Sequence, residues 1–271
     1  MCRLLGYAAP TPRTVSSVLG DDQLAVFRDM AQFHRDGWGS SWIDTAGGIG
    51  LETEKQDTSG LDDPQLVDAL TRFTSKAKIV HLRLATDGMS CVTENTHPFV
   101  AEGFAFAHNG SFPNPASIEP LLSPSVWARL RGDTDSERYF GLIRTFHEDG
   151  RSLSDATLAA VRELQRRYPQ SSLNALLLSD RQLIAVHASS HAPSPVQEFD
   201  KRGIRLESLP AGHTDDYYLM RMRQDSDGTV VFASSGLDIE DWMPLPHDSV
   251  TSVDLSSLAV RTVALSAAGT A

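Results

Sequence analysis

A cysteine stands directly behind the first methionine, at position 2 of the chain. Because the cysteine side chain is small, we expect Met1 to be removed, which would make Cys2 the first residue of the mature protein. Its α-amine, with a reference pKa of about 7.7–8.0, would then lie beside a thiol whose reference pKa is ~8.5. Such an amine can take the thiol proton and activate the sulfur as a nucleophile. Taken alone, Cys2 is better explained as a small hydrophobic residue at the start of a buried strand.

Arg83 is a second candidate, in the run HLRLATDG at residues 81–88. The run reads as a strand that ends in polar residues and a glycine. A planar guanidinium at such a strand exit can hold a carboxylate through two parallel hydrogen bonds. Taken alone, an exposed arginine at an ordinary strand-to-turn junction explains the same residues.

The dipeptide Asn109-Gly110 follows the apolar run at residues 104–107. Asn-Gly usually forms a turn, because both residues tolerate positive φ. The pair also suits an oxyanion hole, since the asparagine amide and the glycine N–H can converge on one developing negative oxygen. The glycine would let a substrate approach the backbone closely.

Asp135 lies in the run GDTDSE at residues 132–137, where a helix is predicted to begin. It can serve as an acid near the positive end of the helix dipole. It can also receive the ammonium group of a substrate. None of the nine histidines, including His97 in NTHPF, has the spacing of a His-Glu-x-x-His zinc site, so the sequence predicts no metal centre.

Together these residues complement a γ-glutamyl group. Arg83 would hold its α-carboxylate and Asp135 its α-ammonium. The thiol of Cys2 would attack the side-chain carbonyl, and Asn109-Gly110 would stabilise the resulting oxyanion.

This set of motifs, in this order, resembles the class II glutamine amidotransferase domain of the N-terminal nucleophile hydrolase superfamily. The matching runs are CRLLG at residues 2–6, DGWG at 36–39, HLRLAT at 81–86, NTHPF at 95–99, HNG at 108–110 and DTDSE at 133–137. The start and the DGWG run are similar to a small stand-alone branch. That branch includes the hydrolase of ergothioneine biosynthesis and the glutathione-degrading amidotransferase subunits. Residues 231–246 resemble its C-terminal segment, but Ser235-Gly236 stands where the pattern has Glu-Pro.

The resemblance implies that Cys2 is the nucleophile and, through its amine, the general base. It implies an oxyanion hole made by Asn109 and Gly110. It further implies that Cys91 has no catalytic role.

The resemblance also assigns the two ends of the substrate. Arg83 would bind the α-carboxylate with support from Thr86, and Asp135 would bind the α-ammonium. His97 and residues 36–39 would shape the pocket. No metal or organic cofactor is implied. The implied fold is a four-layer αββα sandwich at residues 2–255, followed by a C-terminal strand and tail at 256–271.

The elements that must position these groups are of mixed type. Strands are predicted at residues 3–8, 38–44, 78–84, 104–107, 173–178, 183–188, 217–222 and 229–233. Helices are predicted at residues 64–73, 135–147 and 154–168, the last with Ser154 as its N-cap. Hairpin turns fit residues 179–181 and 225–228, and residues 189–212 read as a solvated excursion. The class is α+β.

Length and composition exclude several other classes. The chain has 271 residues, 41% of them hydrophobic and 22% charged, as in an ordinary globular domain. Its 24 basic and 35 acidic residues give a net charge of −11, which argues against nucleic-acid binding. Apolar runs fall far short of the roughly 20 residues that cross a bilayer, so no membrane contact is expected. Two cysteines and no signal peptide predict a cytoplasmic protein.

The predicted activity is hydrolysis of a γ-glutamyl amide bond in a small-molecule substrate, through a thioester on Cys2. Alternatively, the chain is an ammonia-supplying glutaminase subunit whose acceptor chemistry needs an acceptor or synthase partner protein. Two further alternatives are a non-catalytic γ-glutamyl sensor and an N-terminal-cysteine amidase for other acyl groups. The thiol argues against the sensor, and the pair Arg83 and Asp135 argues against an acyl group without a zwitterionic end.

Overall fold

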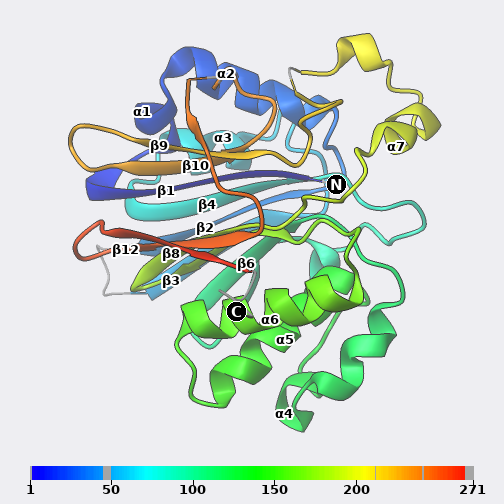
Figure 1. The fold of residues 1–271 in the computed structure, drawn as a ribbon. Coiled ribbons are helices and arrows are strands. Elements are labelled where there is room, and N and C mark those ends of the chain that lie inside the picture. Colours follow the sequence, from blue (N-terminus) through cyan, green and yellow to red (C-terminus); the bar gives the residue numbers. More distant parts are fainter. Residues whose placement is uncertain (1, 45–49, 211, 240, 266–271) are drawn as a thin grey trace.

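The computed structural model describes residues 2–44, 50–210, 212–239 and 241–265 (Figure 1). Two antiparallel sheets form its centre. The first has the order β11-β9-β10-β1-β4-β2-β3 and the second the order β13-β12-β8-β7-β6-β5. The strands of the first sheet are β1 (Cys2–Arg13), β2 (Trp38–Asp44), β3 (Gly50–Gln56), β4 (Ser75–Arg83), β9 (Met220–Gln224), β10 (Val230–Ser234) and β11 (Met243–Pro244). The second contains β5 (Phe99–Ala101), β6 (Phe104–Asn109), β7 (Asn174–Ser179), β8 (Gln182–His187), β12 (Ser249–Asp254) and β13 (Val260–Ala264).

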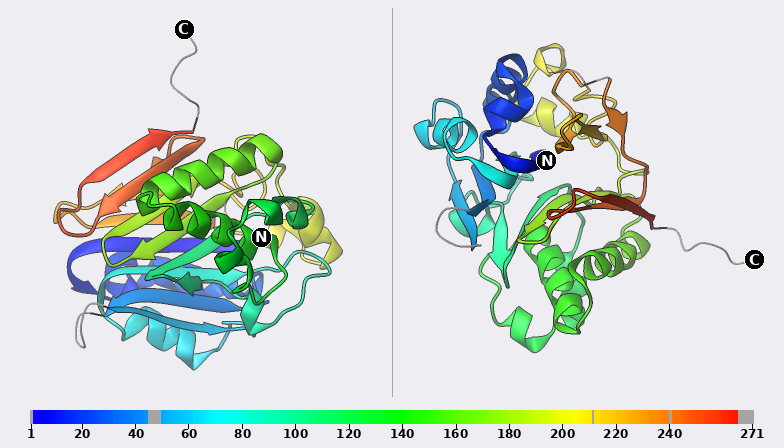
Figure 2. Two further views of the ribbon diagram at one scale, coloured as in Figure 1. Left: turned by 90° about the horizontal axis from the view of Figure 1, so that it is seen from below. Right: turned by 90° about the vertical axis from the view of Figure 1, so that its left-hand side faces the viewer.

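Helices cover the outer face of each sheet (Figures 1 and 2). On the seven-stranded sheet lie α1 (Val15–Leu19), α2 (Asp21–Asp29) and α3 (Pro64–Thr71). On the six-stranded sheet lie α5 (Asp135–Glu148) and α6 (Leu153–Arg167). The short helices α4 (Pro124–Trp127) and α7 (Val196–Lys201) stand outside these layers. The predicted four-layer αββα sandwich is therefore confirmed.

Strand β1 shows why the sequence folds this way. Successive side chains of a strand point to opposite faces. Leu4 and Ala8 pack in the core between the two sheets, whereas Leu5, Tyr7 and Ala9 pack under the helices. All of residues 2–9 are buried, because this strand is covered on both faces. A strand in this position needs a nearly continuous apolar run, which the sequence provides.

The helix positions and both hairpins follow the sequence predictions closely. Strands β7 and β8 join through residues 180–181, and β9 and β10 through residues 225–229. The predicted N-cap Ser154 is wrong, because the helix begins one residue earlier. Ser152 caps α6, and its hydroxyl accepts the backbone N–H of Asp155 at 3.1 Å.

The interpretation of residues 189–212 as a solvated excursion holds for most of the described residues of this stretch, which are exposed or half-buried. This stretch contains α7, whose Phe199 is fully buried against Leu84 and Tyr217. Helix α7 lies at the same end of the sandwich as the beginning of β1 (Figure 1).

The predicted boundary after residue 255 falls between two paired strands. Strand β13 extends the six-stranded sheet by pairing with β12, from Ser249 opposite Ala264 to Val253 opposite Val260. The boundary stays a prediction, and the last six residues of the predicted tail, like Met1, lie outside the described residues. None of the described helices has the length and apolar character required to span a membrane.

Candidate active site

The ends of three strands bring the predicted groups together. On neighbouring strands β1 and β4, Cys2 pairs with Arg83. The last residue of β6 is Asn109, and its side-chain Oδ1 accepts the backbone N–H of Cys2 at 2.8 Å. This contact joins the two sheets across 107 positions of the sequence. The nitrogen of Cys2 is thus fixed beside the predicted oxyanion-hole residue.

The thiol of Cys2 is buried, and its Sγ lies 3.9 Å from the carbonyl oxygen of Leu84. Burial opposes ionisation of a thiol. The positive amino terminus at residue 1, together with a charge and a hydrogen bond from His81, outweighs burial and lowers the pKa of Cys2 from 9.0 to about 5. A thiol with that pKa is largely thiolate at neutral pH, the form that acts as a nucleophile.

Asn109 has one unused donor. Because its Oδ1 accepts from Cys2, its Nδ2 is the opposite end of the amide, and among the described residues Nδ2 has no hydrogen-bond partner. Asn109 is fully buried, and an unpaired buried donor costs about 1–3 kcal/mol. Such a group in a native structure is expected to have a partner supplied by a ligand or water.

Gly110 is required at its position by close packing. A Cβ placed there would lie 1.8 Å from the backbone oxygen of Ser172. The hydroxyl of Ser172 in turn donates to the backbone oxygen of Asn109 at 2.8 Å. The strand exit that carries Asn109 and Gly110 is therefore held tightly against residue 172.

Arg83 and Thr86 border the same small cavity as Cys2, Gly110 and Asp135, about 20 Å³ in volume. The buried guanidinium of Arg83 donates to the backbone oxygens of Asp36 and Ser90, each at 3.1 Å. A guanidinium has five N–H donors. The two donations hold Arg83 in place and leave donors for a carboxylate.

Asp135 is the first residue of α5, behind the N-cap Thr134. Its Oδ2 accepts the backbone N–H of Phe112 at 2.8 Å, and its Oδ1 lies 3.4 Å from the hydroxyl of Ser136. Burial raises the pKa of Asp135 to about 6, against the lowering effect of hydrogen bonds from the backbone N–H groups of Phe112 and Ser136. Across the described residues no cationic side chain forms an ion pair with Asp135. A buried carboxylate in this state suits a positively charged ligand.

Three buried histidines surround the nucleophile. The ring of His97 lies 4.4 Å from that of His81, and within the described part of the chain neither of its nitrogens has a hydrogen-bond partner. Burial keeps the pKa of His97 well below 6.5, so its ring is neutral. Nε2 of His108 lies 3.0 Å from the backbone oxygen of Ser172, so Nε2 carries the proton and Nδ1 accepts from Ser136 at 2.9 Å.

Sequence reasoning placed His97 at the pocket but gave no role to His81 or His108. A signal was available for His81. It lies two positions before Arg83 on a predicted strand, so both side chains must point to one face. The DGWG run also has a visible function, because a Cβ at Gly39 would lie 2.2 Å from the backbone oxygen of His97. Gly39 thus lets residues 97–98 approach the sheet.

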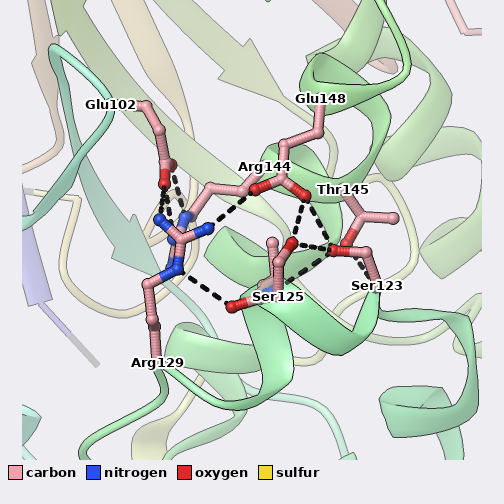
Figure 3. Close-up of polar contacts among 8 residues, drawn as sticks. Glu102, Ser123, Ser125, Arg129, Arg144, Thr145 and Glu148 are labelled. Carbon is pink, nitrogen blue, oxygen red and sulfur yellow. Dashed lines mark hydrogen bonds and ion pairs between the residues drawn. The ribbon is translucent and has the colours of Figure 1, made fainter.

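A larger cavity, of about 750 Å³, is lined in part by Pro98 and Phe99, which directly follow His97 in the sequence. On its wall Arg144 binds Glu102 with two contacts of 2.6 Å, and Arg129 bridges Glu102 and Glu148 at 2.9 and 3.2 Å (Figure 3). The charges of these four side chains are paired with one another within the protein. Among the described residues, no group of three or more histidine, cysteine or acidic side chains could hold a metal ion.

Comparison with known proteins identifies the family and the fold. The sequence pattern of the family "Glutamine amidotransferases class-II" matches residues 1–244. Two glutamine–fructose-6-phosphate aminotransferases (isomerizing) are similar in sequence. That of Methanothermobacter thermautotrophicus is 28% identical over 123 residues, which cover 45% of this chain and 20% of the relative. That of Gluconobacter oxydans is 23% identical over 260 residues, which cover 96% of this chain and 37% of the relative.

The matched segments therefore span only about a fifth and somewhat over a third of the length of these relatives. Among solved structures, a glutamine aminotransferase class-II domain protein from Silicibacter pomeroyi superposes with a TM-score of 0.63 at 19% identity. The match covers 98% of this chain and all of that one. At this identity the likeness shows a shared fold.

Proposed function

The chain belongs to the class II glutamine amidotransferases, and on that premise we propose that it hydrolyses a γ-glutamyl amide bond through a thioester on Cys2. The substrate would be glutamine or a γ-glutamyl conjugate. One observation carries the proposal. The nitrogen of Cys2 is hydrogen-bonded to Asn109, whose buried Nδ2 donor is unpaired among the described residues, and Cys2, Arg83, Gly110 and Asp135 line one cavity.

The proposed reaction assigns a step to each of these residues. The Cys2 thiolate adds to the side-chain carbonyl carbon while the α-amine of Cys2 holds the thiol proton. Asn109 Nδ2 and the N–H of Gly110 donate to the oxyanion. When the tetrahedral intermediate collapses, the C–N bond breaks and the leaving amine takes the proton from the α-ammonium. Water, deprotonated by the same amine, then attacks the thioester and releases glutamate and the free thiol.

The two ends of the glutamyl group would be recognised by charge. Arg83 can present parallel N–H groups to the α-carboxylate, supported by the hydroxyl of Thr86. Asp135 would receive the α-ammonium, and its buried position makes that pairing strong. The neutral ring of His97 would complete the pocket as a hydrogen-bonding wall.

The fate of the leaving group defines two versions of this function. A γ-glutamyl conjugate as substrate would make the protein a simple hydrolase, as in the small stand-alone branch that the sequence resembles. Glutamine as substrate would make it an ammonia-supplying subunit that needs an acceptor or synthase partner protein. Its curated relatives, much longer than this chain, are named glutamine–fructose-6-phosphate aminotransferases, which favours testing glutamine first. A non-catalytic sensor is disfavoured by the activated thiol of Cys2.

A release assay separates these versions. Glutamate production is measured with glutamine and with a series of γ-glutamyl conjugates, using Cys2→Ala as the matched control. We expect glutamate release from at least one of these substrates by the wild type and none by Cys2→Ala. Binding of the substrates without turnover would favour the sensor.

The mechanism predicts that the active protein begins at Cys2, because a free α-amine must lie beside the thiol. Intact-mass measurement of active material tests this. We expect the mass of the chain without Met1. Full activity in protein that quantitatively retains a residue before Cys2 would rule out the N-terminal amine as the base.

When kcat/KM is measured against pH, protonation of Asp135 should cause the first loss of activity on the acid side. Its pKa of about 6 lies above that of the Cys2 thiol, about 5. As pH falls through 6, Asp135 takes up a proton and loses the charge that holds the substrate ammonium, so kcat/KM should fall. In Asp135→Asn the remaining activity should instead begin to fall near pH 5. An unchanged acid limb in the variant would remove Asp135 from substrate binding.

A further inference from the structure

The loop of residues 84–90 follows β4 and carries part of the proposed glutamyl pocket. The side chain of Arg202, at the C-terminal end of α7, contacts this loop. Arg202 is the C-cap residue of α7. Its Nη1 lies 2.8 Å from Oδ2 of Asp36, and its Nη2 donates to the backbone oxygen of Ala85 at 2.7 Å. The same Oδ2 of Asp36 accepts the backbone N–H of Ala85 at 2.8 Å. The peptide groups of Ala85 are therefore held by Arg202 and Asp36 together.

Ala85 stands between the two residues proposed to bind the α-carboxylate, Arg83 and Thr86. Asp36 is tied to Arg83 as well, because the N–H of Asp36 donates to the backbone oxygen of Arg83 at 3.0 Å. In turn, the guanidinium of Arg83 donates a hydrogen bond to the backbone oxygen of Asp36 at 3.1 Å. A closed set of contacts thus runs from Arg202 through Asp36 and Ala85 to Arg83.

Apolar packing brings Arg202 to this place. Phe199, on α7, is buried in one cluster with Leu84 and Tyr217. Leu84 directly precedes Ala85 and offers its carbonyl oxygen to the Cys2 thiol at 3.9 Å. Helix α7 therefore packs on the start of the loop, where Leu84 lies beside the nucleophile.

We propose that Arg202 is a positioning residue that fixes Ala85, and through it Arg83 and Thr86, for binding of the substrate α-carboxylate. This inference rests on the proposed function. Arg202 does not line the cavity described above and acts through Asp36 and Ala85. An exposed ion pair contributes little to stability, because water and salt screen it. The side chains of Arg202 and Asp36 are 23% and 15% exposed, and Arg202 also bonds a backbone carbonyl, so its effect should exceed that of a surface pair.

The first test is steady-state kinetics of Arg202→Met on the full chain. Lys201→Met is the matched control, because Lys201 is the preceding residue, is 57% exposed and pairs with Glu198. We expect Arg202→Met to raise KM roughly tenfold with kcat changed less than about threefold, since the lost fixation affects ground-state binding. Lys201→Met should stay within about twofold of wild type. A similarly small effect of Arg202→Met would overturn the inference.

Two further variants distinguish a positioning role of Arg202 from a general loss of stability. Arg202→Lys keeps a charge and can reach one of the two acceptors, so it should restore part of the loss in KM. Asp36→Asn, which keeps an acceptor for Ala85 but loses the charge, should cost much less in the Arg202→Met background than in wild type. Fully additive effects would mean that Arg202 and Asp36 act separately, which contradicts the proposal.

Hydrogen exchange tests the same contact without any substrate. Backbone amides of residues 84–90 should exchange faster in Arg202→Met than in Lys201→Met, with the amides of β7 unchanged in both. Equal exchange of residues 84–90 in the two variants would refute the positioning role. If wild type released no glutamate from any γ-glutamyl compound, the proposed function would fail, and this measurement would still decide the role of Arg202.

Discussion

Replacing Asn109 by Ala should lower kcat for γ-glutamyl hydrolysis by roughly 10²–10³-fold while changing KM little, as removal of one oxyanion donor does elsewhere. The reason is that Nδ2 of Asn109, unpaired among the described residues, would gain its partner only when the carbonyl oxygen becomes negative. An interaction made in the transition state alone reduces kcat and kcat/KM equally when it is lost. Steady-state kinetics with a single purified substrate measure both constants.

Asn109→Ala removes two contacts at once, the proposed donation from Nδ2 to the oxyanion and the acceptance of the Cys2 N–H by Oδ1 at 2.8 Å. A second variant is needed to separate their effects. Asn109→Asp keeps an acceptor for Cys2 and lacks the Nδ2 donor. We therefore expect Asn109→Asp to lose kcat as well, whereas the thiol of Cys2 should still react with a small alkylating agent. A loss that appears only in KM would make Asn109 a ground-state contact and contradict its place in the oxyanion hole.

Asp135→Asn should cause the second large loss, and it should be specific to the substrate's α-amino group. The variant keeps the shape of the side chain and removes its charge. Wild-type enzyme should discriminate strongly against an analogue without the α-amino group, because Asp135 would then stay buried without a cation. The variant should discriminate much less. The measurement is the ratio of kcat/KM for parent and des-amino substrates in each protein.

Stability supplies the control for Asp135→Asn. Because the folded-state pKa of about 6 lies above the usual 3.8, the folded protein binds more protons than the unfolded chain between these values, and stability falls as pH rises through them. At pH 7 the uncharged variant should therefore melt at a higher temperature than wild type. Equal hydrolysis of parent and des-amino substrates by wild type would leave Asp135 only the role of an acid in the first turn of α5.

Arg83→Lys should also impair hydrolysis of γ-glutamyl substrates, since lysine lacks the planar guanidinium that holds a carboxylate through two hydrogen bonds.

The strands that position the site were predictable because they are buried on both faces. Strands β4, β6, β7 and β8 have runs of buried residues that the sequence shows as short apolar segments. The edge strand β3, Gly50–Gln56, was missed because its residues GLETEKQ are mostly polar and only partly buried. Strand β12, Ser249–Asp254, was missed because SVTSVD contains only two apolar side chains.

The candidate site was predictable as a set of residues and not as a geometry. Cys2, Arg83, Asn109 and Asp135 each occur at the end of a strand or the start of a helix, where local patterns place chemistry-bearing groups. The contacts between them depend on how strands distant in sequence pair. Arg202 shows most clearly what the sequence could not predict. It contacts Asp36, which lies 166 positions away in the sequence, and it belongs to a stretch that has no strong hydrophobic periodicity.

The central claim is that Cys2 carries the γ-glutamyl group as a thioester, and acid quenching followed by mass spectrometry tests it most directly. Wild-type protein mixed with its γ-glutamyl substrate should show a γ-glutamyl adduct on the peptide that begins at Cys2. Hydroxylamine should remove the adduct, because it cleaves thioesters. Cys2→Ala should show neither adduct nor glutamate release. Release of glutamate by Cys2→Ala at the wild-type rate would contradict the account.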